Sequence, residues 1–376
     1  MARRVGPAPA APLLVVGGYG VVGAQVSRLL RQRHPRLPLV LGGRTPRHAR
    51  ALAASIGAST VTVDVGAEEP LAALPERPAA VLAVVSDPDD HLIVDAMRRG
   101  IPIADIHRAA PAGILDITVA AARERPPAPV HLSGSWFAGL GALSAAAAVH
   151  ELGAAERVDI TVLASTDDRV GPDSWGFGER LAWPYYPMHD GRRRPTQPLS
   201  DLREVRCPDG VVRAAALIGT LEQSTAPLLL RVPTVRTRLA LQSRASLYGL
   251  VGLKRSGALR LLARPGLRRV RSALLERPGT GDFAGLTVTA SNATRSVSVE
   301  LLDPSGQAHL SALGAVLAAE RVLAPDTAPG ISFPEQYAEP AADLDALRRA
   351  GVVVRLSGFT RPPGPHPSTT ARKDIA

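Results

Sequence analysis

The stretch from Leu13 to Gly23 constrains the fold of this chain more than any other part of its sequence. A short apolar strand runs into a Gly-x-Gly-x-x-Gly turn made by Gly18, Gly20 and Gly23, and a segment compatible with a helix follows. The first glycine permits a tight turn, the second lets a pyrophosphate approach the backbone, and the third lets the helix pack close to its strand. Because the N–H groups and the positive dipole end of that helix face the turn, the pattern predicts a dinucleotide-binding site. The alternative is a glycine-rich turn without a ligand.

Further apolar runs follow this turn at regular intervals, at 39–45, 60–65, 79–85, 101–106 and 130–134. Helical segments separate them, for example at 90–99. Strands that alternate with helices predict a parallel sheet with right-handed crossovers and a ligand at the carboxyl ends of the strands. Beyond this region, 157–163 alternates with period two, and the spacing of the runs at 211–218, 286–290 and 296–302 suggests a mostly antiparallel sheet.

These patterns predict an α/β fold, with a Rossmann-type doubly wound parallel sheet and a second α+β domain built on a mostly antiparallel sheet. The predicted divisions are a nucleotide-binding domain (1–135), a substrate and dimerisation domain (136–310), a helical segment returning to the first domain (311–357) and a disordered tail (358–376). The tail prediction rests on its proline-rich, polar composition.

The end of the second predicted strand indicates which nicotinamide cofactor is preferred. A fold that prefers NAD usually carries a carboxylate here for the ribose 2′-OH, whereas this chain has Gly42, Gly43 and Arg44. A guanidinium suits a 2′-phosphate, so we expect NADP. The alternative is that Arg44 only stacks on adenine or is solvated. The residues expected to line the cofactor are Gly17, Gly18, Tyr19, Gly20, Val21, Val22, Gly23, Gly43, Arg44, Thr45, Asp64, Val65, Val85, Ser86 and Asp105.

The Gly-Gly-x-Gly-x-x-Gly opening, Gly42-Gly43-Arg44, Asp64-Val65 and Ala104-Asp105-Ile106 together resemble the saccharopine dehydrogenase-like reductases. The resemblance covers residues 12 to about 141, with a partial echo at 312–333. It implies a Rossmann domain interrupted by an α+β domain that binds substrate, and a homodimer. Known members include saccharopine reductases, carboxynorspermidine-type enzymes and trans-acting enoyl reductases, so the resemblance does not specify the substrate.

Candidate catalytic side chains lie just after the fifth predicted strand. His107 is able to donate a proton near neutral pH, and Arg108 is able to hold a substrate carboxylate through two hydrogen bonds. In the alternative, Asp105 caps a helix and His107 is a surface loop residue.

A second candidate group lies in the segment 183–189, which concentrates several of the chain's few aromatic residues. Its prolines predict a loop rather than a regular element. This loop is either a substrate lid, with Tyr185, Tyr186 or His189 as proton donor, or a segment that packs between domains or between subunits.

The formal net charge of +10 invites a nucleic-acid interpretation, but aromatic residues make up only 3% of the chain and no basic–aromatic stacking pattern appears, so we expect no nucleic-acid partner. Segment 257–276 carries Arg260, Arg264, Arg268, Arg269 and Arg271, with Pro265 dividing two short helices. Such a charged face is usually solvated. The alternative is that it binds an acidic carrier protein or an anionic substrate.

Other features narrow the setting. Cys207 is the only cysteine, which excludes an intrachain disulfide and fits a reducing cytoplasm. No apolar run approaches membrane-spanning length, and the nine histidines show no paired metal-ligand spacing, so we expect neither a membrane nor a metal partner.

We therefore predict an NADP-dependent reductase that transfers a hydride to a C=N bond of a small metabolite, as in saccharopine formation. One alternative is a trans-acting enoyl reductase with a carrier-bound C=C substrate. The other is a non-catalytic NADP-binding regulatory protein.

Overall fold

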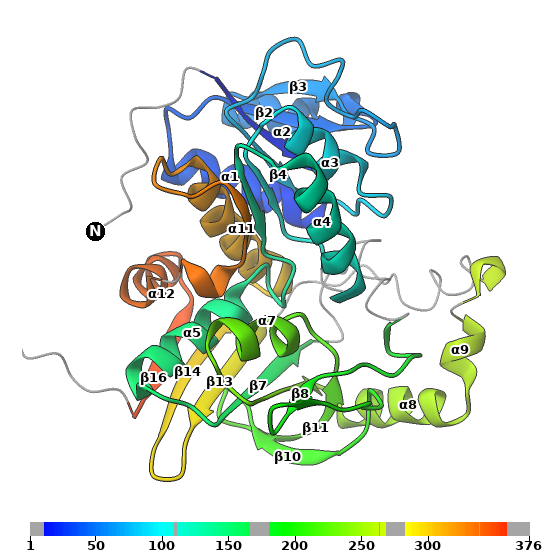
Figure 1. Ribbon diagram of the computed structural model, residues 1–376, viewed down its shortest axis with the longest axis vertical. Helices are drawn as coiled ribbons and strands as arrows, with labels where there is room; N and C mark the ends of the chain where they lie inside the picture. Colours follow the sequence, from blue (N-terminus) through cyan, green and yellow to red (C-terminus); the bar gives the residue numbers. More distant parts are fainter. Residues whose placement is uncertain are drawn as a thin grey trace, which may run out of the picture.

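The computed structural model describes residues 11–108, 111–165, 180–262, 264–267, 283–337 and 339–358 (Figure 1). These residues form two domains, each built on a seven-stranded sheet. The predicted tail lies outside the described residues except for Gly358, as do Arg268, Arg269 and Arg271.

The first sheet is parallel throughout, and its strand order is β15–β6–β5–β4–β1–β2–β3. Without β15 this is the doubly wound order 3-2-1-4-5-6 of dinucleotide-binding folds. The strands are β1 (Leu13–Val16), β2 (Leu39–Gly43), β3 (Ser59–Thr62), β4 (Ala80–Ala83), β5 (Ile103–Asp105), β6 (Pro129–Leu132) and β15 (Gly330–Ser332).

Helices cover both faces of this sheet, which explains why its central strands are apolar on both sides. Leu13 and Val15 of β1 pack with α1 (Val21–Arg33) and α11 (Gln307–Leu323), whereas Leu14 and Val16 pack with α3 (His91–Arg98) on the opposite face. The remaining helices of this domain are α4 (Pro111–Glu124), which joins the α3 face, and η1 (Pro46–Ala49) and α2 (Arg50–Ile56), which lie between β2 and β3. The α/β fold with a Rossmann-type sheet is therefore confirmed.

Helix α11 belongs to the first domain although more than 150 residues separate it from β6. It lies beside α1 in Figure 1. The buried carboxylate of Glu320 fixes this contact, because it pairs with Arg33 at 2.5 Å and with His34 at 2.6 Å at the end of α1. The intervening chain makes the second domain, so the first domain is assembled from two separate parts of the sequence.

The second sheet has the order β10–β11–β12–β7–β13–β14–β16, and all neighbours are antiparallel except β12 and β7. The expectation of a mostly antiparallel sheet is confirmed. Its strands are β7 (Arg157–Ala164), β10 (Arg203–Arg206), β11 (Val212–Ile218), β12 (Thr234–Leu241), β13 (Ala284–Ser291), β14 (Ser296–Asp303) and β16 (Val353–Ser357).

One face of this sheet carries the main core of the domain, in which α5 packs on β13 and β14, α7 on β12, and α12 beside β16. The opposite face holds a smaller cluster that includes Cys207, which is buried. The helices of this domain are α5 (Leu140–Leu152), α7 (Glu222–Leu229), α8 (Arg244–Arg255), α9 (Ala258–Leu262) and α12 (Pro340–Arg349), with short turns η3 (Pro265–Leu267) and η4 (Pro334–Gln336).

The prediction that 183–189 is a loop throughout is wrong at its end. Met188–His189 form β8, which pairs with β9 (Arg192–Arg193), and Tyr185 makes an isolated bridge with Thr196. The turn between β8 and β9 is Asp190-Gly191, and both residues have positive φ, 50° and 70°. An Asp-Gly pair in this conformation matches the right-handed twist of a two-stranded ribbon, which stabilises the hairpin.

The segment 311–357 contributes to both sheets. Its α11 and β15 lie in the first domain, where β15 pairs with β6. Strand β16, however, pairs with β14 at the edge of the second sheet. The expected return to the first domain therefore needs amending after β15, because the apolar side chains of α12 pack in the core of the second domain.

Candidate functional site

The glycine turn after β1 is built from main-chain contacts that leave no room for side chains. Gly17 has φ of 81°, and a Cβ there would lie 2.7 Å from the carbonyl oxygen of Val84. A Cβ on Gly23 would collide with the carbonyl oxygen of Gly17. The Ser27 hydroxyl lies 2.9 Å from the carbonyl oxygen of Gly18 and 2.8 Å from that of Gly23, so it braces the turn against α1.

Gly20 differs from these positions because it faces open space. A Cβ on Gly20 would meet only the Gly17 carbonyl oxygen, at an ordinary 3.4 Å. Helix α1 starts at the next residue, and the N–H groups of its first turn have no partner within the helix. An uncrowded glycine before a helix N-terminus fits a pyrophosphate, whose charge the helix dipole would stabilise.

The loop after β2 is held by Tyr19. The Tyr19 hydroxyl accepts a hydrogen bond from the N–H of Thr45 at 3.1 Å, and its ring lies so close to Gly43 that a Cβ there would collide with it. Arg44 lies between these two fixed residues and is exposed. A guanidinium in this place is free to meet an anion beside the end of β2.

The carboxyl ends of β3 and β4 give two different environments. Asp64 is exposed, and its carboxylate accepts the N–H of Gly66 at 3.1 Å, which closes a local turn. Val65 and Ser86 are half-buried. Val85 lies against Gly17, so the end of β4 adjoins the glycine turn.

Asp105 and Arg108 form a buried ion pair after β5. The Asp105 carboxylate accepts the N–H groups of His107 at 2.7 Å and of Arg108 at 3.1 Å, and it lies 3.3 Å from the Arg108 guanidinium. Arg108 also pairs with Asp90 at 2.5 Å, and its side chain is only 9% exposed. Both carboxylates therefore already occupy this guanidinium, and the Asp105 carboxylate holds the backbone of the loop that follows β5.

Two acids near Arg108, Asp87 and Asp90, have raised pKa values. Burial raises the pKa of Asp87 to about 6, and repulsion from Asp105 adds to this, although the carboxylate accepts the N–H of Ile93. Burial also raises the pKa of Asp90, against the attraction of Arg108. Neither acid is among the predicted site residues, although Ser86-Asp87-Pro88 directly follows a predicted strand.

The loop after β6 lies directly against the loop after β5. A Cβ on Gly134 would overlap the main-chain carbonyl of Arg108, so only glycine allows the two loops to touch. His107, which is half-buried, belongs to this junction. The loop then runs through Ser135 and Trp136 to the start of α5, at the boundary between the domains.

Glu222, the first residue of α7, holds this loop from the second domain. Its side chain is fully buried, and its carboxylate accepts the N–H of Trp136 at 3.2 Å. It lies so close to Gly141 of α5 that a Cβ there would collide with it. Burial raises the pKa of Glu222, and hydrogen bonds from Thr220, Trp136 and Ser135 oppose the rise.

A second buried acid lies next to Glu222. Glu335 in η4 is 7% exposed and accepts a hydrogen bond from the Thr225 hydroxyl of α7 at 2.5 Å. Burial raises its pKa to about 7, and repulsion from Glu222 contributes. One carboxylate oxygen of each acid is buried without a hydrogen-bond partner in the described part of the chain. Since η4 follows β15 of the first domain, the two acids join the domains.

Tyr185 lies near the start of α7. Its ring packs on Gly219, where a Cβ would lie 2.9 Å from the ring. Burial raises the pKa of the Tyr185 phenol, and the neighbouring Gln223 side chain opposes the rise. Gln223 directly follows Glu222, so Tyr185 and the buried acids flank the first turn of one helix.

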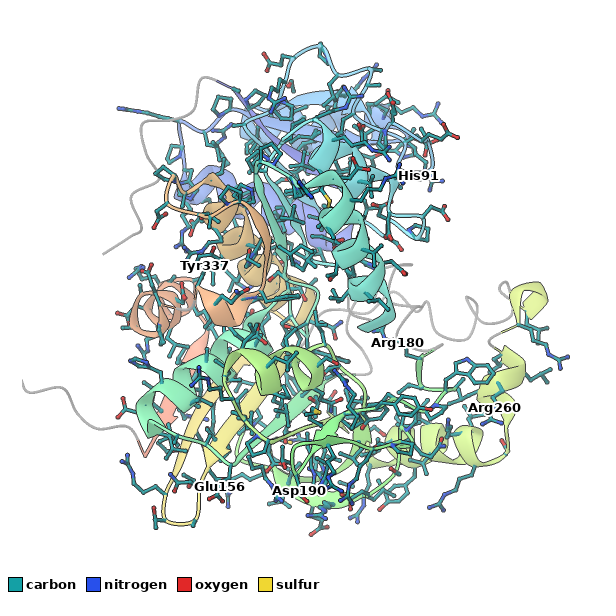
Figure 2. The ribbon with its side chains drawn as sticks, in the orientation of Figure 1. His91, Glu156, Arg180, Asp190, Arg260 and Tyr337 are labelled. Atoms are coloured by element: carbon teal, nitrogen blue, oxygen red, sulfur yellow. The ribbon has the colours of Figure 1, made fainter. Side chains whose placement is uncertain are left out.

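The other aromatic-loop candidates have different surroundings. Tyr186 is 58% exposed. The His189 ring lies 2.8 Å from Asp190 through Nδ1 and accepts from Arg236 through Nε2, which uses both of its nitrogens. Figure 2 shows Asp190 on the side of the second domain that points away from the first. Of the predicted proton donors in this loop, only Tyr185 lies beside the first turn of α7.

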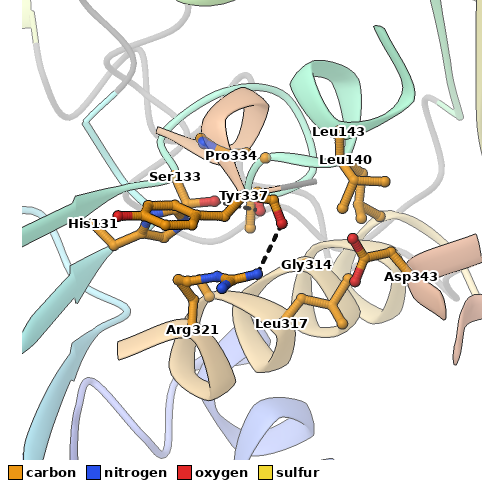
Figure 3. Close-up of a pocket in the computed structure, with 13 residues that line it drawn as sticks. His131, Ser133, Leu140, Leu143, Gly314, Leu317, Arg321, Pro334, Tyr337 and Asp343 are labelled. Carbon is orange, nitrogen blue, oxygen red and sulfur yellow. Dashed lines mark hydrogen bonds between the residues drawn. The ribbon is translucent and has the colours of Figure 1, made fainter. Parts of the chain in front are cut away.

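A small cavity lies on the α11 side of the loop after β6 (Figure 3). Its volume is about 30 Å³, which holds a water molecule or two rather than a substrate. Arg321 lies 4.5 Å from the centre of the Tyr337 ring and donates to the Tyr337 carbonyl at 2.8 Å. Ser133 also lines the cavity and donates to the Ala138 carbonyl, so this polar cluster supports the loop from behind.

Neither a metal centre nor a membrane span is found among the residues that the structure describes. No group of three or more His, Cys, Asp and Glu side chains in these ranges is arranged to hold a metal ion. None of the helices described is both long and apolar enough to cross a bilayer.

Comparison with solved structures identifies the same architecture elsewhere. Saccharopine dehydrogenase (L-Glu forming) from Saccharomyces cerevisiae aligns over 92% of this chain and 99% of its own, with a TM-score of 0.67 and 14% sequence identity. The chain shares the fold of saccharopine dehydrogenase. The predicted resemblance is thus confirmed at the level of the fold.

Other comparisons are weaker. GenD2 from gentamicin A biosynthesis, solved in complex with NAD, aligns over 94% of this chain and 99% of its own, with 14% identity and a TM-score of 0.46. The sequence matches no protein-family model, and no curated protein shows significant sequence similarity to it.

Proposed function

We propose that this protein is an NADP-dependent reductase that acts on a C=N bond of a small metabolite. The observation that carries the proposal is the turn after β1, where Gly20 is open while the backbone crowds Gly17 and Gly23. A turn packed this tightly, with its one open glycine at a helix N-terminus, fits the pyrophosphate of a dinucleotide. The nicotinamide cofactor, when bound, supplies the hydride.

The residues around β1 and β2 would hold the adenosine half. Tyr19 and Thr45 fix the loop, and Arg44 provides a guanidinium for a 2′-phosphate. The nearest acid beyond β3, Asp64, already accepts a local N–H, so no carboxylate competes at the end of β2. These features support NADP over NAD.

Tyr185 is the residue that we propose as proton donor. Burial keeps its phenol protonated throughout the physiological pH range, because the pKa is raised from its ordinary value. As the substrate carbon accepts the hydride, the Tyr185 Oη–H proton would pass to the substrate nitrogen, and solvent would return a proton to the phenolate. The products are an amine and the oxidised cofactor.

The buried acids support a C=N substrate over a C=C substrate. Glu222 and Glu335 lie beside the loop after β6, where little water shields them. As the imine nitrogen takes up the Tyr185 proton it becomes cationic. A cation beside Glu222 and Glu335 would favour their ionised forms and be stabilised by them in a medium of low dielectric constant. An enoyl thioester has no such charge at its double bond. The fold shared with saccharopine dehydrogenase agrees with this choice.

The second candidate is reduction of a C=C bond on a substrate delivered by another protein. The basic helices α8 and α9, which contact the Tyr185 segment through Lys254 and Arg260, favour it.

The test uses the purified chain in two steps. Fluorescence titration compares NADPH with NADH, and NADPH oxidation is then followed with two panels, amine–carbonyl pairs and enoyl thioesters. We expect tighter NADPH binding and turnover with members of the first panel. Turnover confined to enoyl thioesters would replace the first candidate with the second. Tight NADPH binding without turnover in either panel would favour a regulatory protein.

A further inference from the structure

One segment accounts for the positive charge of the whole chain. Of the 44 Lys and Arg residues, 11 lie between residues 223 and 275, and this stretch contains no Asp or Glu. The 33 basic residues elsewhere are slightly outnumbered by the 34 acidic residues. Positive charge that is concentrated in one segment produces a local electrostatic field, which attracts a partner of negative charge.

Much of this basic segment forms a projecting arm. Helices α8 and α9 extend away from both sheets in Figure 1, and Arg260 lies on this arm in Figure 2. Large apolar side chains are exposed along it and on the adjoining segment, namely Tyr248, Leu253, Leu261 and Trp183. Arginines accompany the two aromatic rings: Arg244 lies 5.8 Å from the Tyr248 ring centre and Arg260 lies 5.4 Å from that of Trp183.

We propose that the α8–α9 arm binds a partner protein that presents an acidic face. Exposed Tyr, Trp and Arg side chains are the residues that supply most binding energy at protein interfaces. Arg244 pairs with Glu204, but no acid pairs with Lys254, Arg255, Arg260 or Arg264 among the described residues. Their positive charge then selects an acidic partner and speeds the encounter.

The packing of α8 favours a protein partner over a lipid surface. A helix that lies in a membrane turns its main apolar stripe toward the lipid. In α8 that stripe is used internally, because Leu247 and Val251 are buried in the core of the second domain. The apolar residues that remain exposed, Tyr248, Leu253 and Leu261, lie apart from one another among basic residues and do not form a continuous stripe.

The arm is also connected to the candidate site. Lys254 and Arg260 both donate to the carbonyl of Ala182, at 2.8 Å and 3.5 Å. Ala182 is three residues before Tyr185. A partner on the arm would therefore sit close to the reacting end of the molecule and be able to deliver a substrate. This delivery role rests on the second candidate function, in which another protein delivers the substrate. The binding of the acidic partner to the arm does not depend on either candidate.

The binding test uses a defined probe and no enzymatic readout. The probe is a fluorescent helical peptide with Glu on one face and a Leu stripe on the other, and its affinity for the full chain is measured by anisotropy. The double variant Arg255→Glu/Arg264→Glu should weaken binding by about tenfold or more, since close charge pairs contribute several-fold each. Leu253→Ser/Leu261→Ser, which leaves the charge unchanged, should also weaken it, by about fivefold.

A matched control separates the arm from the general basicity of the chain. Arg123→Glu/Arg349→Glu changes the net charge equally at exposed positions on α4 and α12, and it should leave affinity almost unchanged. Equal losses from the control and the arm variants would overturn the proposal. So would stronger, arm-dependent binding to vesicles of phosphatidylcholine and phosphatidylglycerol or to duplex DNA than to the peptide.

Discussion

The main-chain N–H of Trp136 donates to the carboxylate of Glu222 at 3.2 Å, across the boundary between the two domains. This contact fixes the loop after β6 to α7. Glu222→Ala and Glu222→Gln both remove the ionisable group, but only Gln keeps an acceptor and fills the space. We expect the Ala variant to be less stable than the Gln variant by about 2–4 kcal/mol, from a lost acceptor and a cavity. Equal urea midpoints for the two variants would show that the contact contributes nothing.

Glu335 should make stability depend on pH. Its pKa is about 7 in the folded chain and near the ordinary value of 4.5 when unfolded, so the folded state prefers the protonated acid. Its stabilising contribution is therefore complete below about pH 4.5 and is lost as the pH rises through 7. Glutamine does not ionise, so Glu335→Gln removes this loss of stability. The unfolding free energy of the variant should exceed that of the wild type by roughly 3 kcal/mol at pH 8 and equal it at pH 4. Chemical denaturation at both pH values checks this, and a wild-type advantage at pH 8 would contradict it.

Two glycines of the turn after β1 should respond differently to substitution. Gly20→Val places a side chain in open space, so the unfolding free energy should change by no more than about 1 kcal/mol while NADPH binding is abolished. Gly23→Ala instead collides with the Gly17 carbonyl and should lower stability itself. Normal NADPH affinity in a folded Gly20→Val chain would remove the dinucleotide assignment.

Arg44→Ala should discriminate between the two cofactors. Loss of a charge-assisted hydrogen bond to the 2′-phosphate should weaken the binding of NADPH by about 1–3 kcal/mol and leave the binding of NADH nearly unchanged. Isothermal titration with both cofactors measures the difference. If NADPH and NADH lose affinity equally, Arg44 contacts a part of the cofactor that is the same in both molecules.

Tyr185→Phe removes the proposed proton donor while keeping the ring on Gly219. Turnover should fall by about two to four orders of magnitude, the range for a general acid, with the NADPH dissociation constant unchanged. Tyr186→Phe is the matched control and should retain activity, because that ring is exposed. If His107→Ala causes the large loss instead, the donor lies in the loop after β5.

The sequence allowed the first domain to be predicted in detail because its signals are local. The glycine spacing, the apolar strands and the alternation with helices all lie within short windows, and each predicts the same sheet. The hairpin at β8 and β9 had an equally local signal in Asp190-Gly191, which the surrounding prolines obscured.

The acids at the domain boundary had no such signal. Glu222 and Glu335 are 113 residues apart in sequence, and a glutamate is normally expected at the surface. Only tertiary contact through Thr225 and the loop after β6 buries them. Strands β15 and β16 were missed for a related reason, since each is short and is stabilised by pairing with a distant strand.

The positions of β15 and β16 have a consequence for how the protein is made. Each of the two sheets receives an edge strand from the last fifty described residues, and α11 covers the first sheet only after β7 to β14 of the second domain have been translated. While the chain emerges from the ribosome, the apolar face of β4, β5 and β6 that α11 covers therefore stays open to solvent or to a chaperone. Neither sheet can be completed until β15 and β16 have been made, so the two domains mature together rather than in turn.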